Sequence, residues 1–252
     1  MKRREDNGEA ILPGKAILFA RSFAFWIVFL VSIVLWSLVI LFMAPFSFET
    51  RSKLLVLWSR FTNWWLLKTC KLGYEIQGTE NIPEGSFIIL SKHQSTWETI
   101  SLQMFFPRTV WVAKRELLWL PFFGWAFAAM EPIALDRSAG RRAVEQLVRD
   151  GTTRLKRGRC VVIFPEGTRT APGTVGRYRI GGAVLAEQSA YPVVPIAHNA
   201  GEYWPRREFI KKPGTIRVRI GPTIQSQGKL AQEILAETQH WIEETMKEIS
   251  TY

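Results

Sequence analysis

Residues 91–98 read SKHQSTWE and place a histidine and a carboxylate five residues apart. That offset turns two side chains about 140° apart on an ideal helix, so His93 and Glu98 cannot meet inside one. They meet if His93 precedes a helix that has Ser95 as its N-cap and Glu98 in its first turn. Glu98 would then hold one ring nitrogen of His93, and the other nitrogen could accept a proton from a substrate hydroxyl.

The same spacing also permits a purely structural interpretation. Ser95 and Glu98 fit a capping box, in which the glutamate serves only the end of the helix. His93 would then be an ordinary loop histidine, and the spacing alone leaves both interpretations open.

A second polar segment, residues 164–170, reads FPEGTRT and follows an apolar run. Arg169 offers a planar, bidentate fork that fits a phosphate group, and amides of a turn at Gly167 can add to it. Those amides are also candidates for holding an oxyanion. The alternative is that Glu166 and Arg169 pair with each other and stabilise the loop. Arg137 is another cation at a strand end, after the run 133–135. By itself this signal is weak, because a surface arginine is usually only solvated.

Three further features carry weaker signals. His198 lies in the segment 194–201, VPIAHNAG, and is expected to be structural because the segment reads as a buried strand and a turn. Residues 119–125, WLPFFGW, are consistent with core, with membrane contact or with an acyl pocket. Cys70 and Cys160 lie in no CxxC motif or Cys/His cluster, so we expect neither a disulfide framework nor a metal site.

The elements that must position these residues are strands and helices in alternation. Amphipathic patterns over 139–157 and 228–249 predict helices, and short apolar runs between such patterns predict buried strands. This alternation predicts an α/β fold, a mixed, largely parallel sheet flanked by helices. Ligand sites in such sheets lie past the carboxyl ends of strands, where His93, Arg137 and residues 165–170 fall. The predicted strands are 74–76, 87–90, 110–113, 133–135, 160–164, 193–197 and 216–220.

The first 72 residues predict a hydrophobic helical membrane anchor (1–72) ahead of the catalytic domain (73–252). The apolar run 24–44 would span ~31 Å as a helix, close to the hydrocarbon thickness of a bilayer. Residues 52–71 repeat apolar side chains at helical spacing with charges between them, which is typical of an interfacial helix. Pro45 separates the two. Hydropathy alone predicts one simple span, but five Lys and Arg in residues 1–21 favour a hairpin that keeps both ends cytoplasmic.

Charge supports a membrane rather than a nucleic-acid partner. The chain of 252 residues has a formal net charge of +11, and residues 1–72 carry ten Lys and Arg against four Asp and Glu. Five of the 11 Trp lie there too. Basic residues beside Trp at the ends of an apolar helix suit an anionic membrane surface. Nucleic-acid motifs are missing from the sequence, so we expect no nucleic-acid partner.

Taken together, the segments at 91–98, 133–137, 164–170 and 194–201 resemble, in order and spacing, the motifs of the glycerolipid acyltransferase family, and within it the lysophosphatidate acyltransferases. The resemblance covers about residues 74–205, and FPEGTRT followed by VPIAHNAG is its most specific part. It implies that His93 is catalytic and that Glu98 stands where the family usually has aspartate. It also implies roles in binding the acceptor phosphate or the donor for Arg137, Glu166, Gly167, Thr168, Arg169 and Pro195.

The function implied by the resemblance is transfer of a fatty acyl group to the sn-2 hydroxyl of 1-acylglycerol-3-phosphate, forming phosphatidate. The donor would be acyl-ACP or acyl-CoA, without cofactor or metal, and the acidic carrier protein would suit the basic surface. The partners would be membrane lipids, with the enzyme at the inner (cytoplasmic) membrane and its catalytic domain facing the cytoplasm. Alternatives are another lysophospholipid or lyso-ornithine acceptor, a thioesterase or lipid hydrolase (although GxSxG is missing), and an inactive membrane scaffold.

Overall fold

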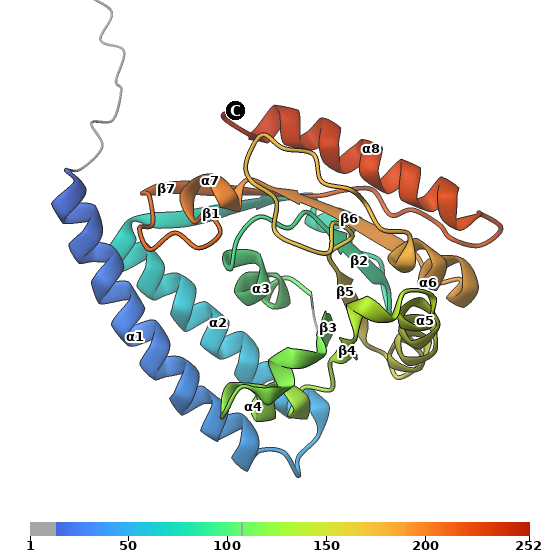
Figure 1. The fold of residues 1–252 in the computed structure, drawn as a ribbon, viewed down its shortest axis with the longest axis horizontal. Helices are drawn as coiled ribbons and strands as arrows, with labels where there is room; N and C mark the ends of the chain where they lie inside the picture. The colour runs from blue at the N-terminus through green and yellow to red at the C-terminus, as the bar shows by residue number, and fades with distance from the viewer. Residues whose placement is uncertain (1–13, 107) are drawn as a thin grey trace, which may run out of the picture.

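The computed structural model describes residues 14–106 and 108–252, except for the side chain of Arg137. In this part of the chain one sheet of seven strands runs in the order β1-β7-β6-β2-β5-β3-β4, with helices on both faces (Figure 1). The strands are β1 (Leu72–Gln77), β2 (Ile88–Ser91), β3 (Thr109–Lys114), β4 (Ile133–Leu135), β5 (Cys160–Ile163), β6 (Val193–His198) and β7 (Gly214–Ile220). The α-helices are α1 (Lys15–Phe42), α2 (Phe48–Cys70), α3 (Trp97–Ser101), α4 (Phe123–Ala129), α5 (Arg141–Lys156), α6 (Gly181–Ser189), α7 (Ala200–Tyr203) and α8 (Ala231–Ile249).

The predicted mixed, largely parallel sheet is confirmed. Strand β2 pairs in parallel with β5 and β6, and β3 pairs in parallel with β4 and β5. Strands β1 and β7 are also parallel, whereas β6 and β7 are antiparallel. The two predicted helices correspond to α5 and α8. Helices α6 and α7 were not predicted, because nine and four residues are too short for a clear amphipathic pattern.

Strand side chains alternate between two cores, one on each face of the sheet. Leu90 and Ile163 pack in a cluster with residues of α5, α6 and α8. Their neighbours Ile89 and Val162 pack in a second cluster with residues of α1 and α2. Gly182 of α6 allows close approach to β2, because a Cβ there would lie 2.7 Å from Leu90 Cδ2. Burial on both faces explains why the central strands are apolar except at the last residue of β2, Ser91, and of β6, His198.

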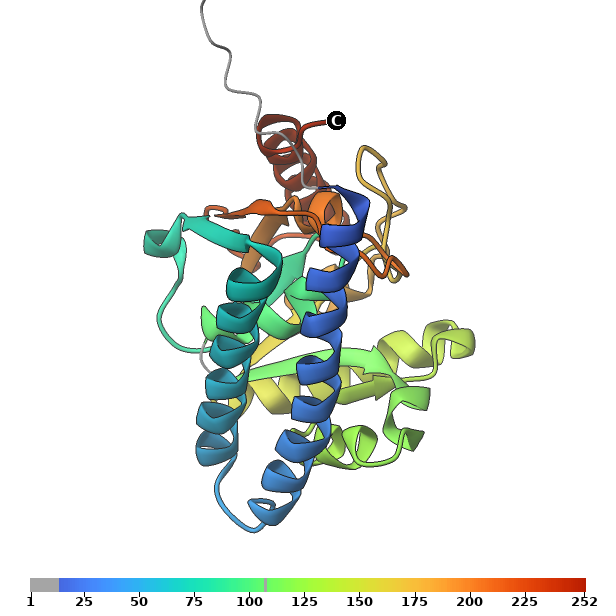
Figure 2. The same cartoon turned by 90° about the vertical axis from the view of Figure 1, so that its left-hand side faces the viewer.

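Helices α1 and α2 form an antiparallel hairpin that packs beside the sheet (Figure 2). The indole Nε1 of Trp58 donates to Ser32 Oγ at 3.1 Å, and that of Trp36 donates to the main-chain oxygen of Leu54 at 3.0 Å. Pro45 lies in the turn between the helices, as predicted. The two helices therefore pack as one unit, with buried polar contacts setting their register.

Helix α1 begins before the predicted run 24–44, because Lys15 and Arg21 are as compatible with a helix as apolar residues are. Among the described residues, it is the helix long and apolar enough to cross a membrane: it has 28 residues, and an 18-residue window within it has a mean hydropathy of 2.8. Its length and composition suit membrane association. Of the basic flank predicted to stay cytoplasmic, residues 1–13 lie outside the described part of the chain.

Candidate active site

His93 lies in the loop after β2, and Glu98 lies in the first turn of α3. The Nδ1 atom of His93 is 2.9 Å from Oε1 of Glu98, so the predicted contact between the two side chains is confirmed. The predicted N-cap was wrong by one residue. Helix α3 begins at Trp97, which places Thr96 at the N-cap, and the Ser95 hydroxyl accepts from the Trp97 N–H at 3.1 Å.

The Glu98 carboxylate is fully buried and ionised. Burial alone would raise its pKa, but the electrostatic effect of the neighbouring His198 and His93 side chains and the hydrogen bonds from His93 and Ser95 together hold the pKa below its ordinary value. A carboxylate only accepts hydrogen bonds, so Nδ1 of His93 donates to Glu98; in the neutral imidazole, Nε2 then carries the lone pair. The same Oε1 accepts from the N–H groups of Gln94 and Ser95 at 2.9 and 2.7 Å. Glu98 therefore serves the helix end and the histidine at once.

The imidazole ring of His93 is held flat against the ring of Phe164, which directly follows β5. The ring centroids are 3.9 Å apart and the planes are 13° from parallel. The His93 side chain is 13% exposed and lines a cavity of about 600 Å³. With Nδ1 engaged and the ring immobilised, Nε2 is the nitrogen left to meet a substrate in the cavity.

The main chain of His93 is clamped by the loop that follows β5. Glu166 Oε2 accepts from the His93 N–H at 2.8 Å, and the Thr170 N–H donates to the His93 carbonyl oxygen at 2.8 Å. The other carboxylate oxygen of Glu166 pairs with Lys92 Nζ at 2.7 Å. The alternative that Glu166 pairs with Arg169 is therefore wrong. The segment FPEGTRT therefore holds the loop that carries His93, and it also faces the cavity.

Lys92 connects this clamp to the C-terminal helix. Its ammonium lies 2.9 Å from Oε1 of Glu243 in α8, and the Tyr178 hydroxyl donates to the same carboxylate at 2.8 Å. The Lys92 side chain is 1% exposed. From the sequence alone, Lys92 is only a cation at the end of a strand. Its partners Glu166 and Glu243 are distant in the sequence, and only the fold brings them to it.

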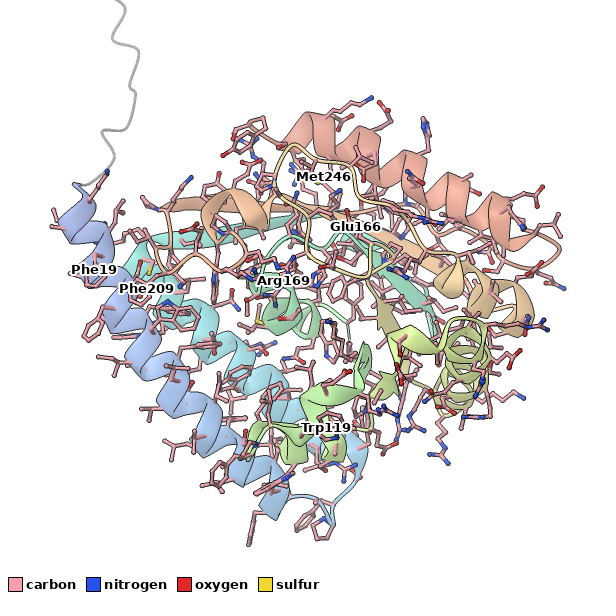
Figure 3. All side chains as sticks on the ribbon, viewed as in Figure 1. Phe19, Trp119, Glu166, Arg169, Phe209 and Met246 are labelled. Carbon is pink, nitrogen blue, oxygen red and sulfur yellow. The ribbon has the colours of Figure 1, made fainter. Side chains whose placement is uncertain are left out.

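The cavity is lined by polar residues from the strand-end loops and by apolar residues from the hairpin and α4. In Figure 3 Arg169 lies beside α3, whereas Glu166 lies closer to α8. A smaller cavity of about 60 Å³ shares part of the apolar lining and continues between α1, α2 and α4. Polar lining residues include His93, Gly167, Thr168 and Arg169; apolar ones include Leu30, Ile33, Leu55, Trp58, Phe123 and Phe127.

Arg169 faces this cavity without a carboxylate partner among the described residues. Burial lowers the pKa of Arg169; Glu98 acts in the opposite direction, and the charge of Arg206 lowers the pKa further. A guanidinium remains charged under such conditions. One cavity is therefore lined both by a cation that has no ion-pair partner among the described residues and by the imidazole of His93.

Known proteins resemble this chain in sequence and in fold. The sequence profile of the acyltransferase family matches residues 73–199. A 1-acyl-sn-glycerol-3-phosphate acyltransferase of Pseudomonas aeruginosa is 45% identical over 235 residues, which is 91% of this chain and 91% of that protein. The chain belongs to the acyltransferase family. The human 1-acyl-sn-glycerol-3-phosphate acyltransferase alpha is 29% identical over 183 residues, 70% of this acyltransferase and 65% of the human protein.

A solved structure has a fold similar to that of this acyltransferase. The crystal structure of the 1-acyl-sn-glycerophosphate acyltransferase PlsC from Thermotoga maritima superposes with a TM-score of 0.79 at 20% identity. The match covers 94% of this chain and 98% of that one, so it includes the hairpin as well as the sheet. At this identity the likeness concerns the fold alone.

The other predicted residues of the acyltransferase site fall in three places. Gly167 and Thr168 line the cavity with Arg169. Glu166 and Pro195 are buried behind it, Glu166 in the clamp and Pro195 within β6. Arg137 begins a short 3₁₀ turn after β4, but its side chain lies outside the described residues, so its contact with substrate stays a prediction.

Gly167 adopts a left-handed conformation, with φ of 68°, and a Cβ there would lie 2.8 Å from Nε of Arg179. Glycine therefore suits this turn sterically as well as conformationally. Its N–H donates to the carbonyl oxygen of Phe164 at 3.0 Å. The suggestion that amides at this turn hold an oxyanion is therefore not supported for Gly167 itself.

His198 is structural in this acyltransferase, as expected. It is fully buried, Nε2 donates to the Lys92 carbonyl oxygen at 2.8 Å, and the Ala200 N–H donates to Nδ1 at 3.4 Å. Burial lowers its pKa. In the aromatic segment 119–125, Phe123 lines the cavity, which is compatible with an acyl pocket. Trp119 is 68% exposed, which is compatible with membrane contact.

Proposed function

We propose that this acyltransferase is a 1-acylglycerol-3-phosphate O-acyltransferase that transfers a fatty acyl group to the sn-2 hydroxyl and forms phosphatidate. The observation that carries the proposal is that one cavity holds a carboxylate-oriented histidine, an unpaired arginine and a long apolar lining. The base matches a hydroxyl, the cation matches a phosphate, and the apolar lining matches acyl chains. The relative that is 45% identical carries the same activity in its name.

In this mechanism His93 is the general base and Glu98 its orienting partner. Nε2 of His93 takes the proton of the sn-2 hydroxyl as the oxygen attacks the thioester carbonyl. The tetrahedral intermediate collapses with cleavage of the C–S bond, and the imidazolium returns the proton to the departing thiolate. Glu98 stabilises the imidazolium through Nδ1. A positioned base contributes about 10²–10⁴-fold, so binding of both substrates in one cavity supplies much of the remaining acceleration.

The acceptor phosphate binds at the FPEGTRT turn. Arg169 provides a bidentate fork, Gly167 and Thr168 shape the cavity wall beside it, and Arg137 is the second candidate cation. Glu166 acts on the acceptor site from behind, by fixing the loop and the main chain of His93. Pro195 acts through the shape of β6, whose neighbour β2 leads directly into the catalytic loop.

The acyl chains lie between the hairpin and the domain, where α1, α2 and α4 line the cavity with apolar side chains. The acyl donor is a thioester of acyl carrier protein or coenzyme A, and the chemistry at the carbonyl is the same for either. No cofactor or metal takes part in the mechanism. The basic surface favours the acidic carrier protein.

The hairpin attaches the protein to the inner (cytoplasmic) membrane with residues 73–252 facing the cytoplasm. Large apolar side chains on the outer surface of α1, α2 and the 119–125 segment support this placement, because water-exposed patches of that extent are rare. Residues 1–72 then form the anchor, and the antiparallel hairpin returns the chain to the side on which it began. Membrane lipids are the partners, and no nucleic acid takes part.

The test uses the purified chain in detergent with labelled acyl donor and lysophosphatidate. Labelled phosphatidate is the expected product. Release of labelled free fatty acid would instead identify a thioesterase, and acylation of a lyso-ornithine lipid or another lysophospholipid alone would overturn the acceptor assignment. An acylated protein that forms and decays at the rate of turnover would contradict the single-displacement mechanism.

A further inference from the structure

Arg206 brings a second guanidinium to the acceptor side of the cavity. It follows α7, beyond the residues 73–199 that match the family profile, and it lines the cavity together with His93 and Arg169. Its Nη1 donates to Thr168 Oγ1 at 3.3 Å and to the main-chain oxygen of Arg169 at 3.5 Å. These contacts hold Arg206 against the FPEGTRT turn.

The two guanidiniums line the cavity, where the buried Glu98 carboxylate acts on Arg169 without forming an ion pair with it. Within residues 14–106 and 108–252, neither Arg169 nor Arg206 forms an ion pair with a carboxylate, although other arginines of this chain do so. Their proximity is unfavourable, and it is one of the factors that lower the pKa of Arg169. Two unpaired like charges at a cavity wall create a strong local field for an anion with more than one charge.

Arg206 also has donors to spare for a ligand. A guanidinium carries five N–H donors, and only Nη1 is used in the contacts with Thr168 and Arg169. The side chain is exposed at the opening, whereas Arg169 is half-buried. An anion between them would meet one cation at the cavity wall and one at the rim.

From this arrangement we infer that Arg206 is a specificity-determining residue that acts with Arg169 to select acceptors bearing a phosphate monoester over those bearing a phosphodiester. The inference rests on the proposed function and adds the residue that distinguishes a monoester headgroup from a diester headgroup. A phosphate monoester carries about −1.5 to −2 charges near neutral pH and three terminal oxygens, so it can occupy two guanidinium forks. A diester carries a single charge and one terminal oxygen fewer.

The experiment measures competitive inhibition of phosphatidate formation by the full chain. The first inhibitor is 1-palmitoylpropanediol-3-phosphate, a monoester that lacks the sn-2 hydroxyl; the second is its methyl phosphate ester, a diester. For Arg206→Gln we expect the inhibition constant of the monoester to rise about 10–100-fold, as for loss of a hydrogen bond between charged groups. The inhibition constant of the diester should change by less than about threefold, which is the effect expected of a single exposed charge.

The matched control is Arg207→Gln, which removes an adjacent exposed arginine that does not line the cavity. It should leave both inhibition constants at the wild-type values. Arg206→Lys should give an intermediate result, because it keeps the charge and loses the fork. In Arg206→Gln the KM for lysophosphatidate should rise while kcat and the thermal midpoint stay near wild type.

Two results would overturn the inference. Equal changes for monoester and diester would mean that Arg206 supplies only general attraction, and values matching those of Arg207→Gln would mean that it does not bind the headgroup. A wild-type chain that makes no phosphatidate would overturn the proposed function itself, together with this inference. The wild-type control therefore separates the two failures.

Discussion

The Glu166 carboxylate accepts a hydrogen bond from the main-chain N–H of His93 at 2.8 Å across 73 residues of sequence. A residue of the loop after β5 thus holds a residue of the loop after β2, and the pairing of these two strands makes the contact possible. The catalytic loop is positioned by its main chain as well as through the Glu98 side chain. The predictions below test that positioning and the cavity that it serves.

Replacing His93 with alanine should lower kcat for phosphatidate formation by about 10²–10⁴-fold, because the proton of the acceptor hydroxyl loses its base. The thermal midpoint should fall moderately, because the buried Glu98 carboxylate loses the hydrogen bond from Nδ1 but keeps those from the N–H groups of Gln94 and Ser95. His240→Ala is the control, an exposed histidine on α8 that should keep wild-type activity. Equal activity of the two variants would remove His93 from the mechanism.

Glu98→Asp tests the departure from the family's usual aspartate. The shorter side chain cannot keep all three hydrogen bonds that Oε1 now accepts, unless α3 moves toward the loop. We expect kcat to fall about 10²-fold, the effect of a misplacement of about 1 Å, with little change in KM. Glu98→Gln, which keeps the length and loses the charge, is the companion variant. A wild-type kcat for the aspartate variant would show that the loop adapts to either length.

Lys92→Met should destabilise the protein by about 3–5 kcal/mol, because it leaves the buried Glu166 carboxylate without its cation. Glu243→Gln should cost less, since that side chain is 16% exposed. Thermal unfolding in detergent measures both. Adding Glu166→Gln to Lys92→Met should recover part of the stability but not kcat, because the neutral amide clamps His93 less well. If the losses in free energy of unfolding caused by Lys92→Met and Glu166→Gln simply added in the double variant, the ion pair between the two side chains would be contradicted.

Ile33→Trp should shorten the apolar part of the cavity from the α1 side. The rate with palmitoyl donors should fall relative to the rate with octanoyl donors, because the larger ring occupies space that the longer chain needs. Leu35→Trp places the same ring on the outer surface of α1, where the leucine is 57% exposed, and should leave the ratio unchanged. An unchanged ratio in Ile33→Trp would place the acyl chain elsewhere.

Lys211 is buried under α1, with its ammonium 3.7 Å from the Trp26 ring centroid and donating to the Phe209 carbonyl oxygen at 2.7 Å. Burial lowers the pKa of Lys211 from 10.5 to about 7, while a Cys70 thiolate would act in the opposite direction. Between about pH 7 and pH 10.5, Lys211 is mostly protonated in the unfolded chain and mostly deprotonated in the folded protein. This group therefore makes the free energy of unfolding rise with pH through that window.

The corresponding variant is Lys211→Met, which keeps the volume and removes the titrating group. Its thermal midpoint should lose the rise that the wild type shows between about pH 7 and about pH 10. The midpoint near neutral pH should be higher than that of the wild type. An identical pH slope in both proteins would mean that Lys211 keeps its charge in the folded state.

Much of the architecture could be read from local patterns. Apolar runs such as 160–164 and 193–197 are strands because they are buried on both faces, and burial of that kind is visible in sequence. The contact of His93 with Glu98 was also predictable, since both residues belong to one loop and one helical turn. The N-cap position differed by one residue because the ends of short helices depend on packing more than on propensity.

The sequence by itself determined the order of the strands and helices, the two helices at the N-terminus and the contact of His93 with Glu98, because each depends on residues close together in the chain. Only the tertiary structure decided that Glu166 turns toward Lys92 and His93 instead of toward Arg169, and that Arg206 joins the cavity. These contacts join segments brought together by strand order and helix packing. Since the sheet places β2 next to both β5 and β6, residues far apart in sequence become neighbours at its edge.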